Sequence, residues 1–433
     1  MNYLPNVLFA IALIVGIGYF TLNVKKLIRN IKLGNDVDVS DNKSQRWKNM
    51  VMIALGQSKM VRRPVAGFLH IIVYVGFVII NIEVLEIIID GLLGTHRIFS
   101  SIGSLYGILI GSFEILAVLV FVSVIVFWIR RNVIRLNRFW KSEMTSWPKN
   151  DANNILYFEM VLMTLFLVMN ATDVHFQAMN SGNIISHSMA PLFNGFSESG
   201  LHTIERTAWW FHIIGILVFL NYLYFSKHLH ILLAFPNTFY ASLKPKGQFN
   251  NLEAVTKEVK MMMDPNIDPF AAPAEGAEMP AKFGASDVQD LNWVQLLNAY
   301  TCTECGRCTS ECPANLTGKK LSPRKIMMDT RDRLEEVGKN IDTNKGTFVE
   351  DGKQLLDNYI TREEIWACTS CNACVEACPV SINPLSIILD MRRFLVMEQS
   401  AAPVELNNMM TNIENNGAPW PYNQMDRLNW KNE

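Results

Sequence analysis

Charged residues are scarce in this 433-residue sequence: only 18% are Asp, Glu, Lys or Arg, whereas 50% are hydrophobic. This composition is too apolar for an ordinary water-soluble protein of this length and indicates membrane spans. The net charge is −1, and no basic tract with interleaved aromatic residues occurs in the cysteine-bearing part, which argues against nucleic acid as a partner. The sequence also lacks a P-loop, a dinucleotide-binding glycine motif and a nucleophile motif, so we expect chemistry on an organic substrate to reside on a partner chain.

Cysteine is rare too, and all eight cysteines lie in two runs with the spacing C-x2-C-x2-C-x3-C-P. This spacing is typical of two-cluster ferredoxins, in which the fourth cysteine of each run ligates the other cluster. We therefore predict two [4Fe-4S] clusters with crossed ligation. One would be held by Cys302, Cys305, Cys308 and Cys378, and the other by Cys368, Cys371, Cys374 and Cys312. Zinc needs only separate CxxC pairs, and disulfides are disfavoured in a reducing cytoplasm, so both alternatives are weaker.

Five apolar segments, each near the roughly 20 residues that cross a bilayer, precede the cysteines. They are residues 4–24, 65–89, 104–128, 154–172 and 207–233. The first has no charge before it and basic residues directly after it, which is opposite to a cleavable signal peptide. Residues 25–64 and 130–150 carry ten and six Lys plus Arg, whereas the other two loops carry one each. The positive-inside rule then predicts an inner (cytoplasmic) membrane protein with its N-terminus outside and its iron–sulfur part in the cytoplasm.

The organisation that follows is a membrane domain, a linker, a cluster domain and a tail. Their bounds are 1–242, 243–284, 285–400 and 401–433. The 55 residues between Cys312 and Cys368 show helical patterns and are too many for a compact ferredoxin with strands. The predicted fold is all-α, with a five-helix transmembrane bundle followed by a cytoplasmic α-helical ferredoxin domain.

Histidines in and near the spans are candidate haem ligands, because imidazole is the usual axial ligand of haem iron. His212 and His230 are 18 residues apart, so a continuous helix would place them on one face, about 27 Å apart. His70 lies at a depth that matches His230, and His175 is the best candidate partner for His212. We expect one or two haem b groups. Interfacial histidines without haem are the alternative.

Carboxylates within the spans form the third candidate group, because an ionisable side chain in a membrane is costly and is by default a functional hypothesis. Glu83 and Glu86 lie on the second span and Glu114 on the third. They could relay protons to a quinone. For Glu86 the alternative is simple pairing with a donor, and for Asp90 a position in the headgroup region is favoured.

Three segments carry a resemblance to known families. Arg62–His70 and Trp209–His230 resemble the nitrate-reductase-gamma-type membrane cytochrome b domain, and Cys302–Pro323 resembles the heterodisulfide-reductase C-type iron–sulfur protein. The resemblance implies His70, His212 and His230 as haem ligands and all eight cysteines as cluster ligands. The gamma-type pattern has two histidines on its second span, and only His70 is present here.

Fusions of these two parts occur in membrane-bound quinone oxidoreductases related to the electron-transfer-flavoprotein:quinone type. Those proteins continue into domains with paired Cys-Cys-Gly motifs, which these 433 residues lack. The resemblance therefore implies a separate iron–sulfur subunit with that motif as a partner, with an electron-transfer flavoprotein or a dehydrogenase as a further partner.

The predicted function is that of a membrane electron-transfer subunit of a quinone-linked oxidoreductase. Electrons would pass between a cytoplasmic redox partner and the menaquinone or quinone pool through the two clusters and haem b. Two alternatives stay open: a haem-free iron–sulfur anchor for a soluble dehydrogenase, and a redox-sensing scaffold. Cluster potentials span more than a volt, so the motif does not indicate the direction of electron flow.

Overall fold

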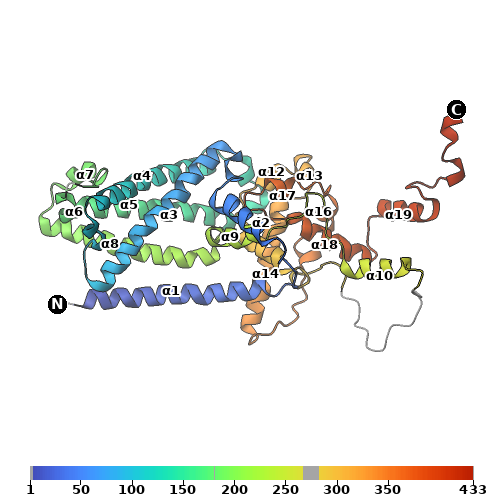
Figure 1. Cartoon of the computed structure of the whole chain (residues 1–433), viewed down its shortest axis with the longest axis horizontal. Coiled ribbons are helices and arrows are strands. Elements are labelled where there is room, and N and C mark those ends of the chain that lie inside the picture. The colour runs from blue at the N-terminus through green and yellow to red at the C-terminus, as the bar shows by residue number, and fades with distance from the viewer. Residues whose placement is uncertain (1–2, 180, 267–281, 433) are drawn as a thin grey trace.

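The computed structural model describes residues 3–179, 181–266 and 282–432, which form an elongated helical molecule in two parts (Figure 1). The N-terminus lies at the far end of the membrane-type part and the C-terminus beyond the cysteine-bearing part. Within the described residues the only β-structure is a pair of isolated bridges, and no strand is formed. The prediction of an all-α fold is confirmed.

Five helices in the N-terminal part are long and apolar enough to cross a membrane. They are α1 (Leu4–Ile31), α3 (Pro64–Leu93), α4 (Ser104–Asn132), α5 (Trp147–Thr172) and α8 (Glu198–Tyr222). Each packs against two others, so that the order α1, α3, α4, α5, α8 closes into a ring. Apolar side chains such as Ile14 and Ile108 point away from the ring and are 73% and 71% exposed. This surface suits lipid, and helices satisfy their own backbone hydrogen bonds there.

Local sequence signals set several helix ends. Pro64 occupies the first turn of α3, where its missing N–H costs nothing, and Gly94 ends that helix with a left-handed φ of 73°. Ser197 caps α8, and its hydroxyl accepts a hydrogen bond from the Gly200 N–H at 3.2 Å. Because capped polar turns extend the helix beyond its apolar part, α8 begins nine residues before the predicted segment 207–233.

The prediction of one continuous helix through that segment is wrong. α8 ends at Tyr222, and Ser226 is extended, with φ −114° and ψ 148°. Its hydroxyl accepts a hydrogen bond from the His228 N–H at 3.1 Å and starts a new turn, after which α9 (His230–Phe239) begins. His212 and His230 therefore lie on different helices, and the calculation that put them on one face does not apply.

Four short helices complete the membrane-type part: α2 (Lys43–Met50), α6 (Val174–Ala178), α7 (Ser186–Met189) and α9. In Figure 1, α6 and α7 lie at the end of the bundle near the N-terminus, whereas α2 and α9 lie where the two parts meet. The residues of the predicted linker include α10 (Glu253–Met263), while positions 267–281 lie outside the described residues.

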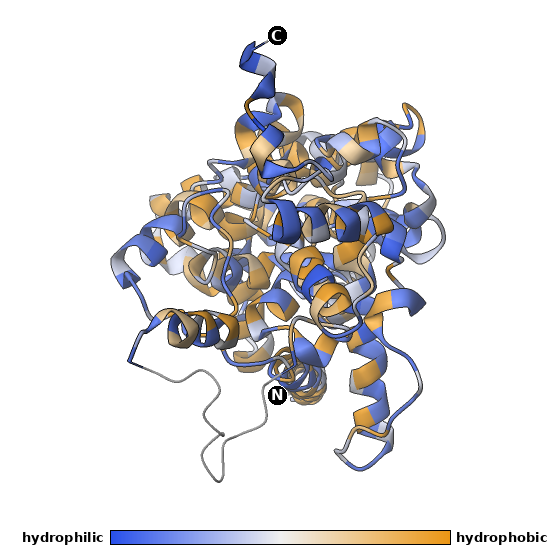
Figure 2. Ribbon diagram, turned by 90° about the vertical axis from the view of Figure 1, so that its right-hand side faces the viewer, coloured by the Kyte–Doolittle hydropathy of each residue, from blue (hydrophilic) through white to orange (hydrophobic). Residues whose placement is uncertain are grey.

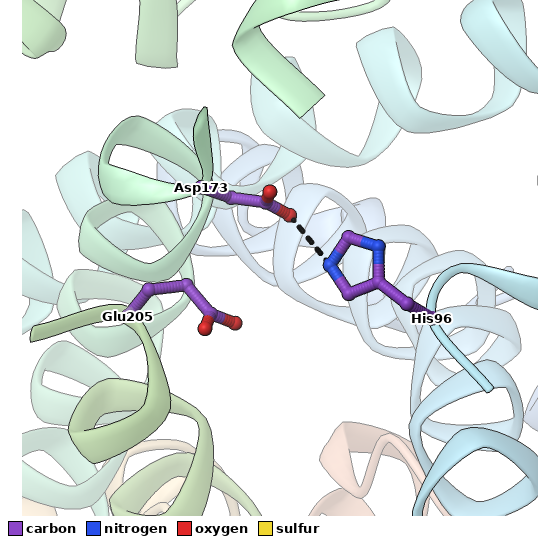
Figure 3. A group of neighbouring side chains, drawn as sticks. All are labelled: His96, Asp173 and Glu205. Carbon is purple, nitrogen blue, oxygen red and sulfur yellow. Dashed lines mark ion pairs between the residues drawn. The ribbon is translucent and has the colours of Figure 1, made fainter. Parts of the chain in front are cut away.

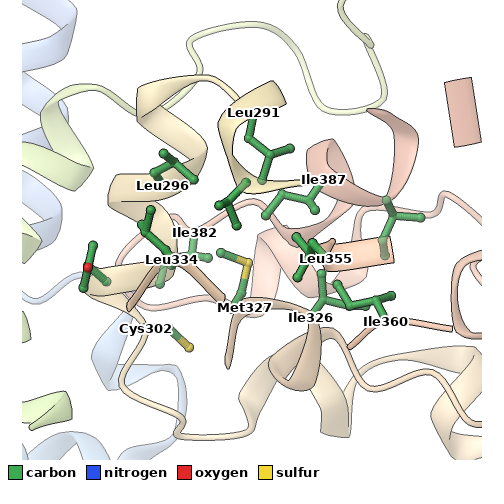
Figure 4. Packing of buried hydrophobic residues seen from close by; sticks show 14 of the residues in the cluster. Leu291, Leu296, Cys302, Ile326, Met327, Leu334, Leu355, Ile360, Ile382 and Ile387 are labelled. Atoms are coloured by element: carbon green, nitrogen blue, oxygen red, sulfur yellow. The ribbon is translucent and has the colours of Figure 1, made fainter. Parts of the chain in front are cut away.

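The cysteine-bearing part consists of short helices around two longer ones. It contains α11 (Trp293–Thr301), α12 (Arg307–Ser310), α13 (Pro313–Leu316), α14 (Pro323–Thr343), α15 (Leu355–Asn358), α16 (Arg362–Trp366), α17 (Ala373–Ala377) and α18 (Pro384–Met397). Its core is dry and aliphatic, and the Cys302 side chain lies at its edge (Figure 4). The tail carries α19 (Val404–Asn416). Seen from this end, hydrophilic and hydrophobic residues alternate along the helices (Figure 2).

A buried arginine fixes the long insertion between the two cysteine runs. The Arg333 guanidinium on α14 is fully buried and donates to Asp287 at 2.7 Å, to Asp351 at 2.6 Å and to the Lys353 carbonyl at 2.7 Å. A buried guanidinium is tolerated only when its donors are paired in this way. The insertion thus closes against the start of the cluster domain.

The two parts are joined by direct polar contacts as well as by the chain. Asn30, at the end of α1, donates to the Tyr300 hydroxyl at 2.9 Å, and both groups are buried. Arg324 of the cysteine-bearing part pairs with Glu143 at 2.7 Å, and the Arg324 side chain is 0% exposed. Buried hydrogen-bonded pairs of this kind fix the orientation of one part on the other.

Candidate redox centres

The first cysteine run forms a tight loop that ends in a helix. Cys302 follows α11, and Glu304 and Gly306 adopt left-handed φ values of 53° and 71°. These turn the chain back so that Cys308 comes from α12 while Cys312 precedes Pro313 of α13. Gly306 suits this turn because glycine adopts a positive φ without strain.

Two cavities gather the eight cysteines in a crossed arrangement. The first is lined by Cys302, Cys305, Cys308 and Cys378, together with Cys374. The second is lined by Cys312, Cys368, Cys371 and Cys374. Cys378 therefore lies with the first three cysteines, and Cys312 lies with the three of the other run. This is the neighbourhood that crossed ligation of two clusters requires.

The chemistry of these sulfurs fits iron–sulfur clusters. Burial raises the pKa of the Cys302 and Cys374 thiols to about 12 each, so the sulfurs ionise only beside a cation. Iron supplies that cation, because a thiol that coordinates a metal is deprotonated. The backbone N–H of Ile382 donates to Cys378 Sγ at 3.2 Å, and such hydrogen bonds stabilise a coordinated thiolate.

Basic side chains are concentrated at the first cavity. Arg138, Arg307 and Lys59 all interact electrostatically with its cysteines, and two of the three come from the membrane-type part. Arg307 also donates to the Lys59 and Met60 carbonyls, each at 3.1 Å, which fixes the cavity against the loop before α3. Among the described interactions of the second cavity, Arg392 is the cation beside Cys368.

The predicted pair of His70 and His230 is brought together. Their ring centroids are 6.4 Å apart with an interplanar angle of 43°. Two imidazoles on opposite sides of one metal, each bonded at about 2 Å, have ring centres roughly 6 Å apart. His230 Nδ1 lies 3.1 Å from the Lys227 carbonyl, which leaves Nε2 for a metal, and His70 Nδ1 is buried with no hydrogen-bond partner.

A cavity beside His230 has the lining that a haem needs. It measures about 220 Å³ and combines aromatic and aliphatic residues with His228 and His230. Its cationic side chains, which would suit the two carboxylates that haem b carries, are Arg130, Arg131, Arg138 and Lys227. The residues present therefore fit one haem at this end of the bundle, in contact with the cysteine-bearing part.

His212 is placed differently. It is 2% exposed on α8, its Nδ1 has no hydrogen-bond partner, and its ring centroid lies 6.2 Å from that of Phe166. His175, the expected partner, lies 5.9 Å from His96 instead, again between ring centroids. Within the described part of the chain, no second imidazole makes a ring contact with His212, so the donor set of a second bis-histidine haem is incomplete.

The three candidate carboxylates have three different environments. Glu114 is fully buried and accepts hydrogen bonds from Asn170 at 3.1 Å, the Ile185 N–H at 2.7 Å and the Ser186 N–H at 3.0 Å. These bonds anchor the chain before α7 to α4. A carboxylate with this many donors is committed to structure.

Glu86 is also paired, as its alternative interpretation predicts. It accepts hydrogen bonds from the Phe99 N–H at 2.9 Å and from the Tyr106 hydroxyl at 3.0 Å. Glu83 differs, because it is 3% exposed and its Oε2 has no hydrogen-bond partner. Both side chains line a cavity of about 400 Å³ at the end of the bundle opposite the cysteines. Glu83 is therefore the carboxylate that is free to exchange a proton.

Two buried ionic groups are not predicted by the sequence analysis. The first joins Arg97 to Asp173 at 2.8 Å and to Asn170 at 2.8 Å. Burial tends to raise the pKa of Asp173, but the hydrogen bond from His96 and the charge of Arg97 outweigh it and hold that pKa below its ordinary value. In the sequence, Arg97 stands out only as the single basic residue of its loop.

The second group joins the two parts of the molecule. Glu304, between the first two cysteines of its run, pairs with Lys227 of the bundle and with Arg331 of α14, the latter at 2.8 Å. All three side chains are at most 17% exposed. Neither group has a sequence motif, and the one available signal is an ionisable residue next to a predicted ligand.

Comparison with known proteins agrees with the cysteine analysis. Residues 301–382 match the family described as "4Fe-4S dicluster domain". The chain is 28% identical to "Probable iron-sulfur-binding oxidoreductase FadF" of Bacillus subtilis over 98% of its own length and 60% of the relative. It is 25% identical to "EtfAB:quinone oxidoreductase" of Syntrophomonas wolfei over 94% of its own length and 57% of that protein. The chain thus spans about three fifths of these two relatives.

A third relative covers the cysteine-bearing part. This part is similar to the C-type component of the ferredoxin/F(420)H(2)-dependent CoB-CoM heterodisulfide reductase of Methanosarcina acetivorans, with 32% identity over 25% of the chain and 52% of the relative. No solved structure matches the chain. The comparisons support iron–sulfur clusters and a relationship to iron–sulfur oxidoreductases, in agreement with the predicted class of enzyme and with the resemblance of the cysteine-bearing part.

Proposed function

We propose that the chain is the membrane electron-transfer part of a quinone-linked oxidoreductase. Two [4Fe-4S] clusters on the crossed cysteine sets and haem b on His70 and His230 would supply one-electron chemistry between a cytoplasmic redox partner and the quinone pool. The observation that carries the proposal is the position of Thr303. It lines both the first cysteine cavity and the cavity of His230, so the two candidate sites are adjacent.

The cysteine sets differ in their distance from the bundle, and this sets their order. The loop of the first set is held against the chain before α3 by Arg307. The second set includes Cys371, which is exposed to solvent. The first set therefore faces the histidines, and the second faces the partner. The basic residues at the first cavity stabilise the added negative charge of a reduced group there.

The same arrangement supports the proposed sidedness. Basic residues of the loops at residues 25–64 and 130–150 meet the cysteine-bearing part, as in the pairs of Arg63 with Glu311 at 2.9 Å and Lys26 with Asp342 at 2.9 Å. By the positive-inside rule these loops face the cytoplasm of an inner-membrane protein, with the N-terminus outside. The electron donor or acceptor of the clusters would then be a cytoplasmic electron-transfer flavoprotein, a dehydrogenase or a separate subunit with Cys-Cys-Gly motifs.

The test is reoxidation of the anaerobically purified, dithionite-reduced protein by a water-soluble menaquinone analogue. A b-type absorption band and the electron paramagnetic resonance signals of both clusters are expected to disappear together on addition of the quinone. About eight non-haem irons per chain with no haem band would contradict the proposal and favour the haem-free anchor. A haem band that the quinone leaves reduced would contradict the assignment of the acceptor.

Replacement of Glu83 separates the proton-handling interpretation from a structural one. In Glu83→Gln we expect the quinone-dependent rate to fall by about tenfold or more, the lower end of what a positioned proton-transfer group contributes, with haem and iron contents unchanged. The matched control is Glu114→Gln, which should lower the thermal stability of the bundle because the amide accepts the Ile185 and Ser186 N–H bonds less strongly. An unaltered rate in Glu83→Gln would remove this residue from the proposed function.

A further inference from the structure

One cluster of metal-ligating side chains lies outside the redox centres. His96 of the chain between α3 and α4, Asp173 after α5 and Glu205 of α8 point toward one another at the end of the bundle opposite the cysteines (Figure 3). One ligand atom from each lies within 4.8 Å of the others. We propose that these three residues bind a divalent transition-metal ion of the zinc type.

The donor set and its spacing fit such an ion. Imidazole nitrogen and carboxylate oxygen are both zinc ligands, with bonds of about 2.0–2.2 Å that place two ligands of a tetrahedral ion roughly 3.3 Å apart. His96 Nε2 and Asp173 Oδ2 are 3.2 Å apart. Glu205 requires only a side-chain movement within the 4.8 Å limit to complete three protein ligands. The fourth position stays open to water, as in zinc sites with three protein ligands.

The surroundings favour a cation over an anion. The three residues border the cavity of about 400 Å³, whose wall contains five carboxylates and two guanidinium groups. The carboxylates belong to Glu83, Glu86, Asp90, Asp173 and Glu205, and the guanidinium groups to Arg97 and Arg206. Three carboxylates thus have no guanidinium counterpart in the wall.

An independent observation in the same cavity also points to a ligand. Glu83 is 3% exposed, and its Oε2 has no hydrogen-bond partner, while the residue lines the cavity wall. A buried unpaired carboxylate oxygen is costly unless a cation or a donor approaches it. A metal-bound water on the open position would provide such a donor.

The neighbours of the ligands hold them in place. Asp173 Oδ1 accepts the Phe176 N–H at 3.0 Å, and Asp173 Oδ2 accepts the Arg97 Nε–H at 2.8 Å. Arg206 pairs with the Glu205 carboxylate. Hydrogen bonds of this kind orient the carboxylates of a metal site. Because His96, Asp173 and Glu205 come from three separate segments, a bound ion would fasten this end of the bundle.

The test uses the full-length, cluster-loaded protein in detergent after removal of loosely bound metal with a chelator. Zinc binding is measured by equilibrium dialysis with metal analysis, and zinc X-ray absorption identifies the ligand atoms. We expect one zinc per chain with nitrogen and oxygen ligands and no sulfur. Sulfur ligands would show binding at the cysteines and would overturn the proposal, as would the absence of a stoichiometric site at micromolar zinc.

Two variants and one control locate the site. His96→Ala and Glu205→Gln should each weaken zinc binding at least tenfold, whereas His187→Ala, which removes an exposed histidine at the same end, should leave it unchanged. Asp173 is left in place because it caps α6 and pairs with Arg97. Haem and iron contents report whether each variant is folded. Equal zinc affinity in wild type, His96→Ala and Glu205→Gln would overturn the proposal while leaving the electron-transfer function untouched.

Discussion

Replacement of His70 by alanine is expected to remove the b-type haem that faces the cysteine-bearing part. The His70 and His230 rings come from two different helices, and their spacing suits a shared metal. His70→Ala and His230→Ala should therefore lose the same absorption band, and all haem if the chain binds one. Reduced-minus-oxidised spectra with haem quantified per chain provide the measurement.

His228 supplies the matched control for this experiment. Its ring lies 5.4 Å from that of His230 and borders the same cavity. It is nevertheless assigned no ligand role, so His228→Gln should keep the band while non-haem iron stays constant in all three variants. Loss of the band in His228→Gln with retention in His230→Ala would transfer the ligand role to His228. A second haem that survives His70→Ala would assign His212 to an outer site.

The second large effect concerns the crossed cysteines, and double replacement gives a count that single replacement cannot. If Cys302 and Cys378 bind one cluster, Cys302→Ala combined with Cys378→Ser should lose only that cluster and retain about four irons per chain. Cys302→Ala combined with Cys312→Ser should lose both clusters and nearly all non-haem iron.

Uncrossed ligation predicts the reverse pattern, so the iron counts of the two double variants decide between the schemes. Electron paramagnetic resonance of the first double variant gives a further check. Its remaining signal should belong to the set that includes the exposed Cys371. Loss of both signals in each double variant, with unfolding by circular dichroism, would show that the clusters fold the domain together, and the single variants Cys378→Ser and Cys312→Ser would then be compared by iron content.

The sequence was sufficient for features that depend on composition and local spacing. Five spans follow from hydropathy, and each predicted span overlaps one long helix. The grouping of Cys378 with the first run and of Cys312 with the second follows from the motif, and the two cavities gather them in that way. The pairing of His70 with His230 follows from their depth alone.

Other features depend on tertiary structure or on a break that hydropathy does not mark. The residues from Tyr222 to His230 contain no glycine or proline, so nothing in their composition signals that the helix ends and restarts at Ser226. The distinction between Glu83 and Glu114 rests on donors that come from the distant chain near Ile185. Asp173 and Arg97 are 76 residues apart, and no local pattern could have paired them.

The first helix has a further consequence for biosynthesis. Its end away from the N-terminus is completed by late parts of the chain, because Arg29 pairs with Asp342, which is 313 residues further on. At the 5–20 residues per second of ribosomal synthesis, about 15–60 s separate the appearance of these two partners. Throughout that interval the polar end of α1 is available to anionic lipid headgroups. The order of events is therefore insertion of the helix first and exchange of lipid contacts for protein contacts later, when the cysteine-bearing part arrives.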